Sequence, residues 1–161
     1  DDDGKQTINI KTKHKNIDGG TVLLPLSQES DGTLKMFALY QFIQDCMDRG
    51  SVLLVDELNS RLHPLLVRNI LLTFLNSKVN TNHAQIIFTS HDTWQLENNI
   101  LRTDEMWFTN KDENGVSSLY SLADFQEDDV VQNYAENYLL GQYGAIPSLK
   151  PLMQLGDKKN G

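Results

Sequence analysis

The sequence predicts an α/β protein built around a parallel βαβ unit. Residues 51–55 form a short run that is apolar after its first serine, which is typical of a strand buried on both faces of a parallel sheet. Residues 84–89 form a second such run, and a helical pattern lies between them, starting at Pro64 and reaching about Asn76. In a strand–helix–strand unit the two strands are expected to be parallel, with a right-handed crossover.

A hairpin and a long helix are expected before this unit. Residues 5–14 alternate between polar and apolar side chains, and residues 22–26 form the predicted return strand after a glycine-containing turn. A helix is predicted from about 33 to 48, with Gly50 as its stop. The side chains that three-and-four spacing places on its buried stripe are Leu34, Phe37, Ala38, Gln41, Phe42, Asp45 and Cys46.

A second hairpin and a further helix are expected after the unit. Its predicted strands are 105–109 and 117–122, joined by an Asp-Glu-Asn-Gly turn. Residues 127–140 are expected to form an acidic helix with aromatic side chains, and 152–161 a disordered tail. The whole chain, 1–161, is expected to be a single domain. Two tryptophans are interpreted as packing residues, Trp94 and Trp107.

The composition of the chain excludes some classes of protein function. The net charge of -8 argues against a general nucleic-acid coat and against a binder of anionic membranes. The lysines near the start of the chain are interpreted as a solvated hairpin edge. Cys46 is the only cysteine, which fits a reducing cytoplasm, and no apolar run approaches the roughly 20 residues that span a membrane. The chain starts at Asp1 without a methionine, so we expect a fragment of a longer protein.

Candidate chemistry lies at the ends of the two predicted parallel strands. Asp56 and Glu57 follow the first strand directly, and His91 follows the second. Open α/β sheets place their chemistry at the carboxyl ends of strands, and an ATPase needs one acid to hold Mg²⁺ and another to act on the attacking water. The alternatives are a helix cap or solvated turn for the acids and a structural role for the histidine. A metal nuclease is also conceivable, although no third acid is evident at a matching strand end.

The segment before the long helix is a second candidate. Residues 29–33 read Glu-Ser-Asp-Gly-Thr, and small residues expose backbone N–H groups at a helix N-terminus, which favours an anion. Ser30 adds a hydroxyl donor. The alternative is an ordinary helix cap, with Ser30 or Asp31 as the N-cap.

In this order the three features resemble the C-terminal half of an ABC-type ATPase head, which is a partial P-loop NTPase. The sequence at 30–33 resembles a signature loop, 52–57 a Walker B strand and 59–62 a D-loop, and His91 resembles a switch histidine. The Glu-Ser-Asp-Gly-Thr form, together with Leu-His-Pro at 62–64, Thr-Ser-His-Asp at 89–92 and the late segment 138–147, resembles bacterial AAA-type ATPases of the abortive-infection group more narrowly. These are distant relatives of SMC and RecF heads, and the resemblance covers about residues 5 to 150.

The resemblance implies ATP binding and hydrolysis by a homodimer that sandwiches two nucleotides. Asp56 would orient Mg²⁺, Glu57 would polarise the attacking water, and His91 would contact the γ-phosphate. Asn59 would pack across the dimer seam. The residues that would face the nucleotide held by the other protomer are Ser30, Asp31, Gly32 and Thr33.

One departure from the family is decisive for the isolated chain. No Gly-x-x-x-x-Gly-Lys-Ser/Thr phosphate loop is present, because Gly4-Lys5 is followed by Gln6 and lacks the upstream glycine. A Q-loop is not found either. In the family these elements belong to the N-terminal half of the head, so we expect the isolated chain to be inactive and that half to be a partner.

Several functions stay open for such a head. The resemblance favours an ATP cycle that gates a phage-defence effector, either a nuclease or a toxin. One alternative is an ATP-sensing dimer scaffold whose turnover is incidental, and another is a DNA-repair head of the SMC or RecF kind. A transporter ATPase is the least favoured, since the loop departs from the Leu-Ser-Gly-Gly-Gln form.

Overall fold

The computed structural model describes residues 8–97, 100–125 and 133–147. Contacts between α-carbons divide the chain into two compact units, Asp1–Asp92 and Thr93–Gly161. That the two make up one domain stays a prediction.

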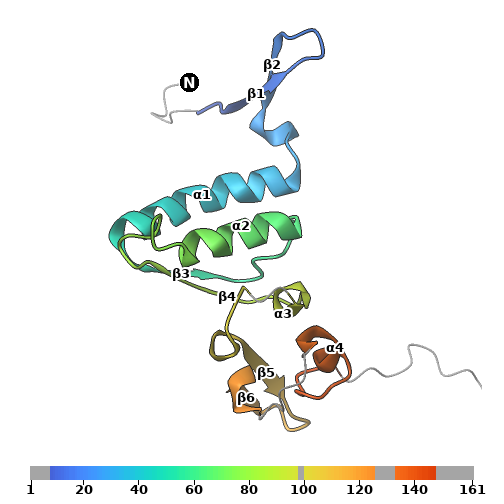
Figure 1. Cartoon of the computed structure of the whole chain (residues 1–161). Helices are drawn as coiled ribbons and strands as arrows, with labels where there is room; N and C mark the ends of the chain where they lie inside the picture. The colour runs from blue at the N-terminus through green and yellow to red at the C-terminus, as the bar shows by residue number, and fades with distance from the viewer. Residues whose placement is uncertain (1–7, 98–99, 126–132, 148–161) are drawn as a thin grey trace, which may run out of the picture. The chain divides into compact units, whose positions relative to one another are not determined.

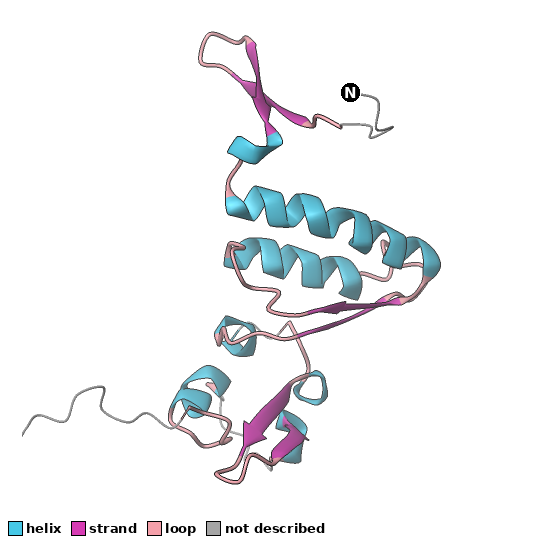
Figure 2. Ribbon diagram, turned by 180° about the vertical axis from the view of Figure 1, so that it is seen from behind, coloured by secondary structure: helices cyan, strands magenta, loops and turns pink. Residues whose placement is uncertain are grey.

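The first unit contains the predicted parallel βαβ arrangement. Strand β3 (Val52–Val55) is followed by helix α2 (Pro64–Leu75) and strand β4 (Gln85–Phe88), and the two strands pair in parallel. Helix α1 (Asp31–Arg49) precedes β3. Figures 1 and 2 show α1 and α2 side by side on the same side of this two-stranded sheet. The prediction of a mixed α/β protein with a parallel core is confirmed.

Local signals in the sequence explain where the two helices begin and end. The Ser30 side chain accepts a hydrogen bond from the backbone N–H of Thr33 and so caps α1. Gly50 ends α1 with a φ of 62°, and a Cβ at this position would lie 2.2 Å from the carbonyl oxygen of Asn82. The ring of His63 accepts from the N–H of Leu65 just ahead of α2.

The prediction that β3 and β4 are buried on both faces is wrong for the part of the chain that the structure describes. Leu54 is 72% exposed and its register partner Ile87 is 61% exposed. Leu53 and Ile86, which point to the other face, are half-buried. Alternate side chains of a strand lie on opposite faces, and both helices cover the same face, so the other face stays open.

The predicted stripe of α1 is also wrong in part. Cys46 is buried as expected, but Phe37 and Phe42 are 51% and 61% exposed. The covered stripe runs instead through Leu39 and Ile43 to Cys46. The helix carries apolar side chains around most of its circumference, so spacing alone does not identify the face that packs on the sheet.

The predicted N-terminal hairpin is confirmed, but its first strand, expected over residues 5–14, begins only at Lys11, and residues 8–10 are not in a strand. Strands β1 (Lys11–Lys15) and β2 (Thr21–Pro25) pair antiparallel, and a short 3-10 helix, η1 (Leu26–Gln28), leads out of the hairpin. Glu29 follows this helix and accepts hydrogen bonds from Thr12 and His14 of β1.

The second unit holds the predicted second hairpin, β5 (Trp107–Lys111) and β6 (Ser117–Ser121), which pair antiparallel. The hairpin is flanked by shorter elements: α3 (Trp94–Glu97), η2 (Thr103–Glu105), η3 (Leu122–Asp124) and α4 (Tyr134–Leu139). The prediction of one helix over 127–140 is wrong at Asn133, which caps α4 and is not helical itself. Residues 126–132 and the predicted tail at 152–161 lie outside the described residues.

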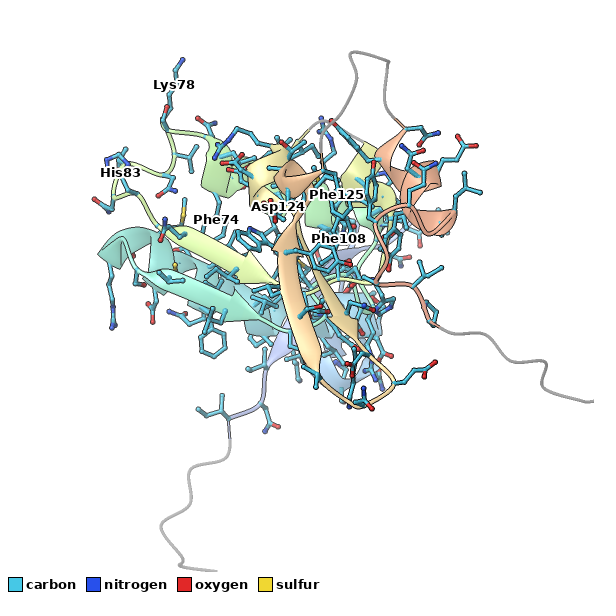
Figure 3. All side chains as sticks on the ribbon, turned by 90° about the horizontal axis from the view of Figure 1, so that it is seen from below. Phe74, Lys78, His83, Phe108, Asp124 and Phe125 are labelled. Atoms are coloured by element: carbon cyan, nitrogen blue, oxygen red, sulfur yellow. The ribbon has the colours of Figure 1, made fainter. Side chains whose placement is uncertain are left out.

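An aromatic cluster forms the core of the second unit. The ring of Phe108 stacks on those of Tyr138 and Tyr143, with 5.5 Å between ring centroids in each pair. Phe125, labelled with Phe108 in Figure 3, meets Tyr143 edge-on at 5.0 Å. The late segment of the sequence therefore supplies packing side chains. Trp107 does not join them, because it is 58% exposed, which corrects its interpretation as a packing residue.

Candidate functional site

The two acids and the histidine lie at the same edge of the parallel sheet. Asp56 and Glu57 follow β3, and His91 lies just beyond the end of β4. Val55 is paired with Phe88, so the carboxyl ends of both strands meet. We call Asp56, Glu57 and His91 the acid edge.

Thr89 connects the two strands at the acid edge. Its hydroxyl donates a hydrogen bond to Oδ1 of Asp56 and accepts one from the backbone N–H of Glu57 at 2.8 Å. The backbone carbonyl of Thr89 accepts from the N–H of Leu58 at 3.1 Å. Thr89, directly after β4, therefore positions both of the acids that follow β3. Sequence reasoning did not single out Thr89, although it is the first residue of the Thr-Ser-His-Asp segment that pointed to His91.

The side chains of the acid edge are exposed and make few contacts. Asp56, Glu57 and His91 are all exposed. In the part of the chain that the structure describes, the carboxylate of Asp56 bonds only to Thr89. The carboxylate of Glu57 and the ring of His91 form no hydrogen bond with any described residue.

The turn after the acids is held in an uncommon backbone conformation. Glu57 has a φ of 47° and Arg61 a φ of 62°, a region that L-residues rarely adopt and that costs on the order of 1–3 kcal/mol each. Residues 57–61 form what we call the acid loop. Leu58 anchors it through a side chain that is 0% exposed. The side-chain oxygen of Asn59 is buried and has no hydrogen-bond partner among the described residues.

Lys35 reaches this loop from α1. Its ammonium donates to the carbonyl oxygens of Glu57 at 2.7 Å, Leu58 at 3.2 Å and Ser60 at 2.8 Å. Burial lowers the pKa of Lys35, and the nearby carboxylate of Glu57 acts in the opposite direction. Sequence reasoning missed this lysine, because nothing in the local pattern distinguishes it from a surface residue of the helix.

The first turn of α1 packs against the other end of the acid loop. A Cβ on Gly32 would lie 2.9 Å from the carbonyl oxygen of Arg61, so only glycine fits without a shift. Asp31 and Arg61 form an exposed ion pair at 3.4 Å. The predicted loop at 30–33 and the segment after the acids are therefore in direct contact.

Ser30 acts as the N-cap of α1, which bears out the cap interpretation of its hydroxyl. Its oxygen lies 2.9 Å from the hydroxyl of Thr33, and both residues are exposed. An open pocket of about 660 Å³ lies at this end of the helix. It is lined by residues 30–33 together with Met36, Arg61, His63 and Leu66.

Within the described residues, no group of three or more His, Cys, Asp or Glu side chains gathers in a way that could hold a metal ion. Among the same residues no helix has the length and apolar character needed to cross a membrane.

Asp56, Glu57 and His91 follow the carboxyl ends of the two parallel strands, which is where open α/β sheets bind their ligands. Comparison with protein families indicates the class of protein. The family described as "AAA domain, putative AbiEii toxin, Type IV TA system" matches residues 1–93, which is more than half of the 161 residues. The chain belongs to this family, and membership indicates a nucleotide-binding, ATPase-like function. The resemblance to AAA-type ATPases of the abortive-infection group is confirmed. No curated protein and no solved structure matches the chain.

Proposed function

We propose that this chain is one half of an ATPase head that hydrolyses ATP with Mg²⁺ at the acid edge. The observation that carries the proposal is the pair of hydrogen bonds from the Thr89 hydroxyl to Asp56 and Glu57. They join the acids that follow β3 to the segment after β4, which also contains His91. Family membership supports the choice of a nucleotide as ligand. The sequence has no phosphate loop, so we propose that a further segment, the N-terminal half of the head, supplies it.

The residues of the acid edge fit a magnesium ion and a phosphate. Mg²⁺ is usually held by one or two carboxylates together with waters and substrate phosphates, and Asp56 is an exposed carboxylate with one oxygen already oriented by Thr89. When bound, the ion offsets the charge that develops on the phosphate oxygens. Asp56 is assigned to the metal, Glu57 to the attacking water and His91 to the γ-phosphate.

Glu57 is suited to orient and polarise a water molecule. Its carboxylate is exposed and bonds to no described residue, while its backbone N–H and C=O are both held. The side chain therefore starts from a fixed backbone but keeps its oxygens for a ligand. Phosphoryl transfer depends mainly on positioning and on compensation of charge, so a fixed base is what the reaction needs.

The pocket at the start of α1 is assigned to a second protomer. We propose a homodimer in which Ser30, Asp31, Gly32 and Thr33 face the nucleotide bound by the partner, with Asn59 at the seam. The pocket lies at a helix N-terminus, where backbone N–H groups favour an anion.

The biological role that we propose is control of an effector in the cytoplasm during phage defence. Support comes from the toxin–antitoxin description of the family and from the single cysteine, which fits a reducing compartment. ATP binding would close the dimer and hydrolysis would open it, which would let the nucleotide gate a nuclease or toxin.

The test is Glu57→Gln in the complete head, by which we mean this chain together with the half that carries the phosphate loop. We expect ATP binding to be kept, hydrolysis to fall strongly and an ATP-dependent dimer to accumulate. Glu113→Gln is the matched control, since Glu113 is an exposed glutamate at the tip of the β5–β6 hairpin. Hydrolysis at the wild-type rate by Glu57→Gln would show that Glu57 is not the base.

A further inference from the structure

The ammonium group of Lys35 is fully committed to one stretch of backbone. An ammonium has three N–H donors and no acceptor, and here three carbonyl oxygens of the acid loop, those of Glu57, Leu58 and Ser60, receive them. The distances are 2.7, 3.2 and 2.8 Å. A surface lysine usually extends into solvent, as Lys78 does in Figure 3, where it points away from the ribbon.

The acid loop needs such a contact because its own hydrogen bonds are few. Leu58 donates its N–H to the carbonyl of Thr89, and the N–H groups of Ser60 and Leu62 close two tight turns. The positive φ values of Glu57 and Arg61 work against this conformation. Thr89 holds the loop from the side of β4, and Lys35 holds it from the side of α1.

Lys35 also lies only two residues after Thr33, on the same helix α1. In the same region Gly32 touches the carbonyl of Arg61, and Asp31 pairs with the guanidinium of Arg61. The start of α1 and the acid loop therefore form one assembly, and Lys35 is its connection closest to Glu57.

We propose that Lys35 is a positioning residue that sets the place of Glu57, and of the loop that follows, relative to the start of α1. This inference rests on the proposed function. Lys35 touches the backbone carbonyl of Glu57 and is therefore not itself assigned to the chemistry. Lys35 would affect the reaction indirectly, because it fixes the backbone of Glu57 and so sets the orientation of the Glu57 side chain.

Loss of this contact should lower turnover more than substrate affinity. A displacement of about 1 Å at a reacting group can reduce a rate by about 100-fold. We expect Lys35→Met in the complete head to reduce kcat for ATP hydrolysis by about 10- to 100-fold, with KM within about threefold of wild type. Lys35→Arg should also be impaired, because a planar guanidinium does not converge on three carbonyls as an ammonium does. Lys78→Met is the control.

Hydrogen exchange provides a readout that does not depend on activity. In Lys35→Met the amides of Leu58, Ser60 and Leu62 should exchange at least about tenfold faster, whereas the amides of α2 should not change. If both exchange and kcat change in this way, the proposal stands. Faster exchange with an unchanged kcat would overturn it, and so would unchanged exchange.

Two further outcomes separate this proposal from the function on which it rests. If the unaltered complete head does not hydrolyse ATP, the proposed function fails, and the catalytic consequence of Lys35 fails with it, while the exchange data still report whether Lys35 holds the loop. If Lys35→Met does not fold, as judged by circular dichroism and gel filtration, the decision passes to Lys35→Arg. A wild-type kcat for Lys35→Arg would then overturn the role of the three-carbonyl geometry.

Discussion

Replacing Thr89 by valine tests how the acid edge is assembled. Valine keeps the shape of threonine and removes only the hydroxyl, which donates to Asp56 and accepts from the N–H of Glu57. Each acid then loses its contact with β4 through this side chain, while the backbone pairing of Leu58 with Thr89 is kept. The substitution therefore separates the positioning of the acids from the pairing of the strands.

The magnitude follows from the two hydrogen bonds. A bond to a charged group contributes roughly 1.5–3 kcal/mol and a neutral one about 0.5–1.5 kcal/mol. Asp56 and Glu57 are exposed, so water replaces much of what is lost, and we expect a fall in unfolding free energy of about 1–2 kcal/mol. Turnover should fall more clearly, by about 10- to 100-fold in kcat, because both acids lose their orientation.

The assay combines urea denaturation with steady-state ATP hydrolysis by the complete head. Thr73→Val is the matched control, since the Thr73 hydroxyl bonds to the carbonyl of Asn69 within α2 and has no contact with the acids. Thr89→Ser keeps the hydroxyl and should recover most of the activity. A Thr89→Val protein that keeps the kcat of the wild type would refute the view that this hydroxyl positions the acids.

Two predictions concern the framework of the first unit. Asn80 is buried, donates to the carbonyls of Phe74 and Ala84 and accepts from the N–H of Ala84, so Asn80→Ala should lower the unfolding free energy by about 2–4 kcal/mol in urea denaturation. Asn110→Ala, at an exposed position of β5, is the control, and an equal loss in both variants would contradict the reasoning. Hydrogen bonds from Thr12 and then His14 lower the pKa of Glu29, so its stabilising contribution is present at neutral pH and is lost as the pH falls through that lowered pKa. Titration of Glu29 by NMR should show a midpoint below the ordinary value for glutamate that rises in Thr12→Val; an ordinary midpoint in the wild type would disprove the contact.

The order and type of the main elements followed from local patterns. The stop at Gly50 and the proline at the start of α2 are signals that act within one turn of the chain, and each was found where it was predicted. Ser30 is the N-cap, one of the two alternatives for the cap, and α1 begins at Asp31, two residues before the expected start. The parallel pairing of β3 with β4 followed from the strand–helix–strand order. The same order predicts that Asp56, Glu57 and His91 lie at the carboxyl ends of neighbouring strands.

Predictions about packing were less successful, because packing depends on partners that are distant in sequence. Phe37 and Phe42 looked like core residues of α1 and are exposed, and Trp107 is exposed as well. The sequences of β3 and β4 are as apolar as those of strands in a sheet that is covered on both faces. The side chains of Leu54 and Ile87 are nevertheless exposed in the described structure. Hydrophobicity predicts that a side chain can be buried, but only the neighbouring elements determine whether it is.

The class of this protein was predictable from local sequence patterns: the α/β order, the pair of acids, the histidine and the small-residue loop together pointed to an ATPase-like family. How these residues are held depends on contacts between distant parts of the chain. Lys35 belongs to no motif, and the Thr-Ser-His-Asp segment drew attention to His91 and not to Thr89. The roles of Thr89 and Lys35 arise because the end of β4 and α1 bring a hydroxyl and an ammonium to the backbone around Glu57. Such contacts join residues that lie 22 and 32 positions apart, and no local pattern encodes them.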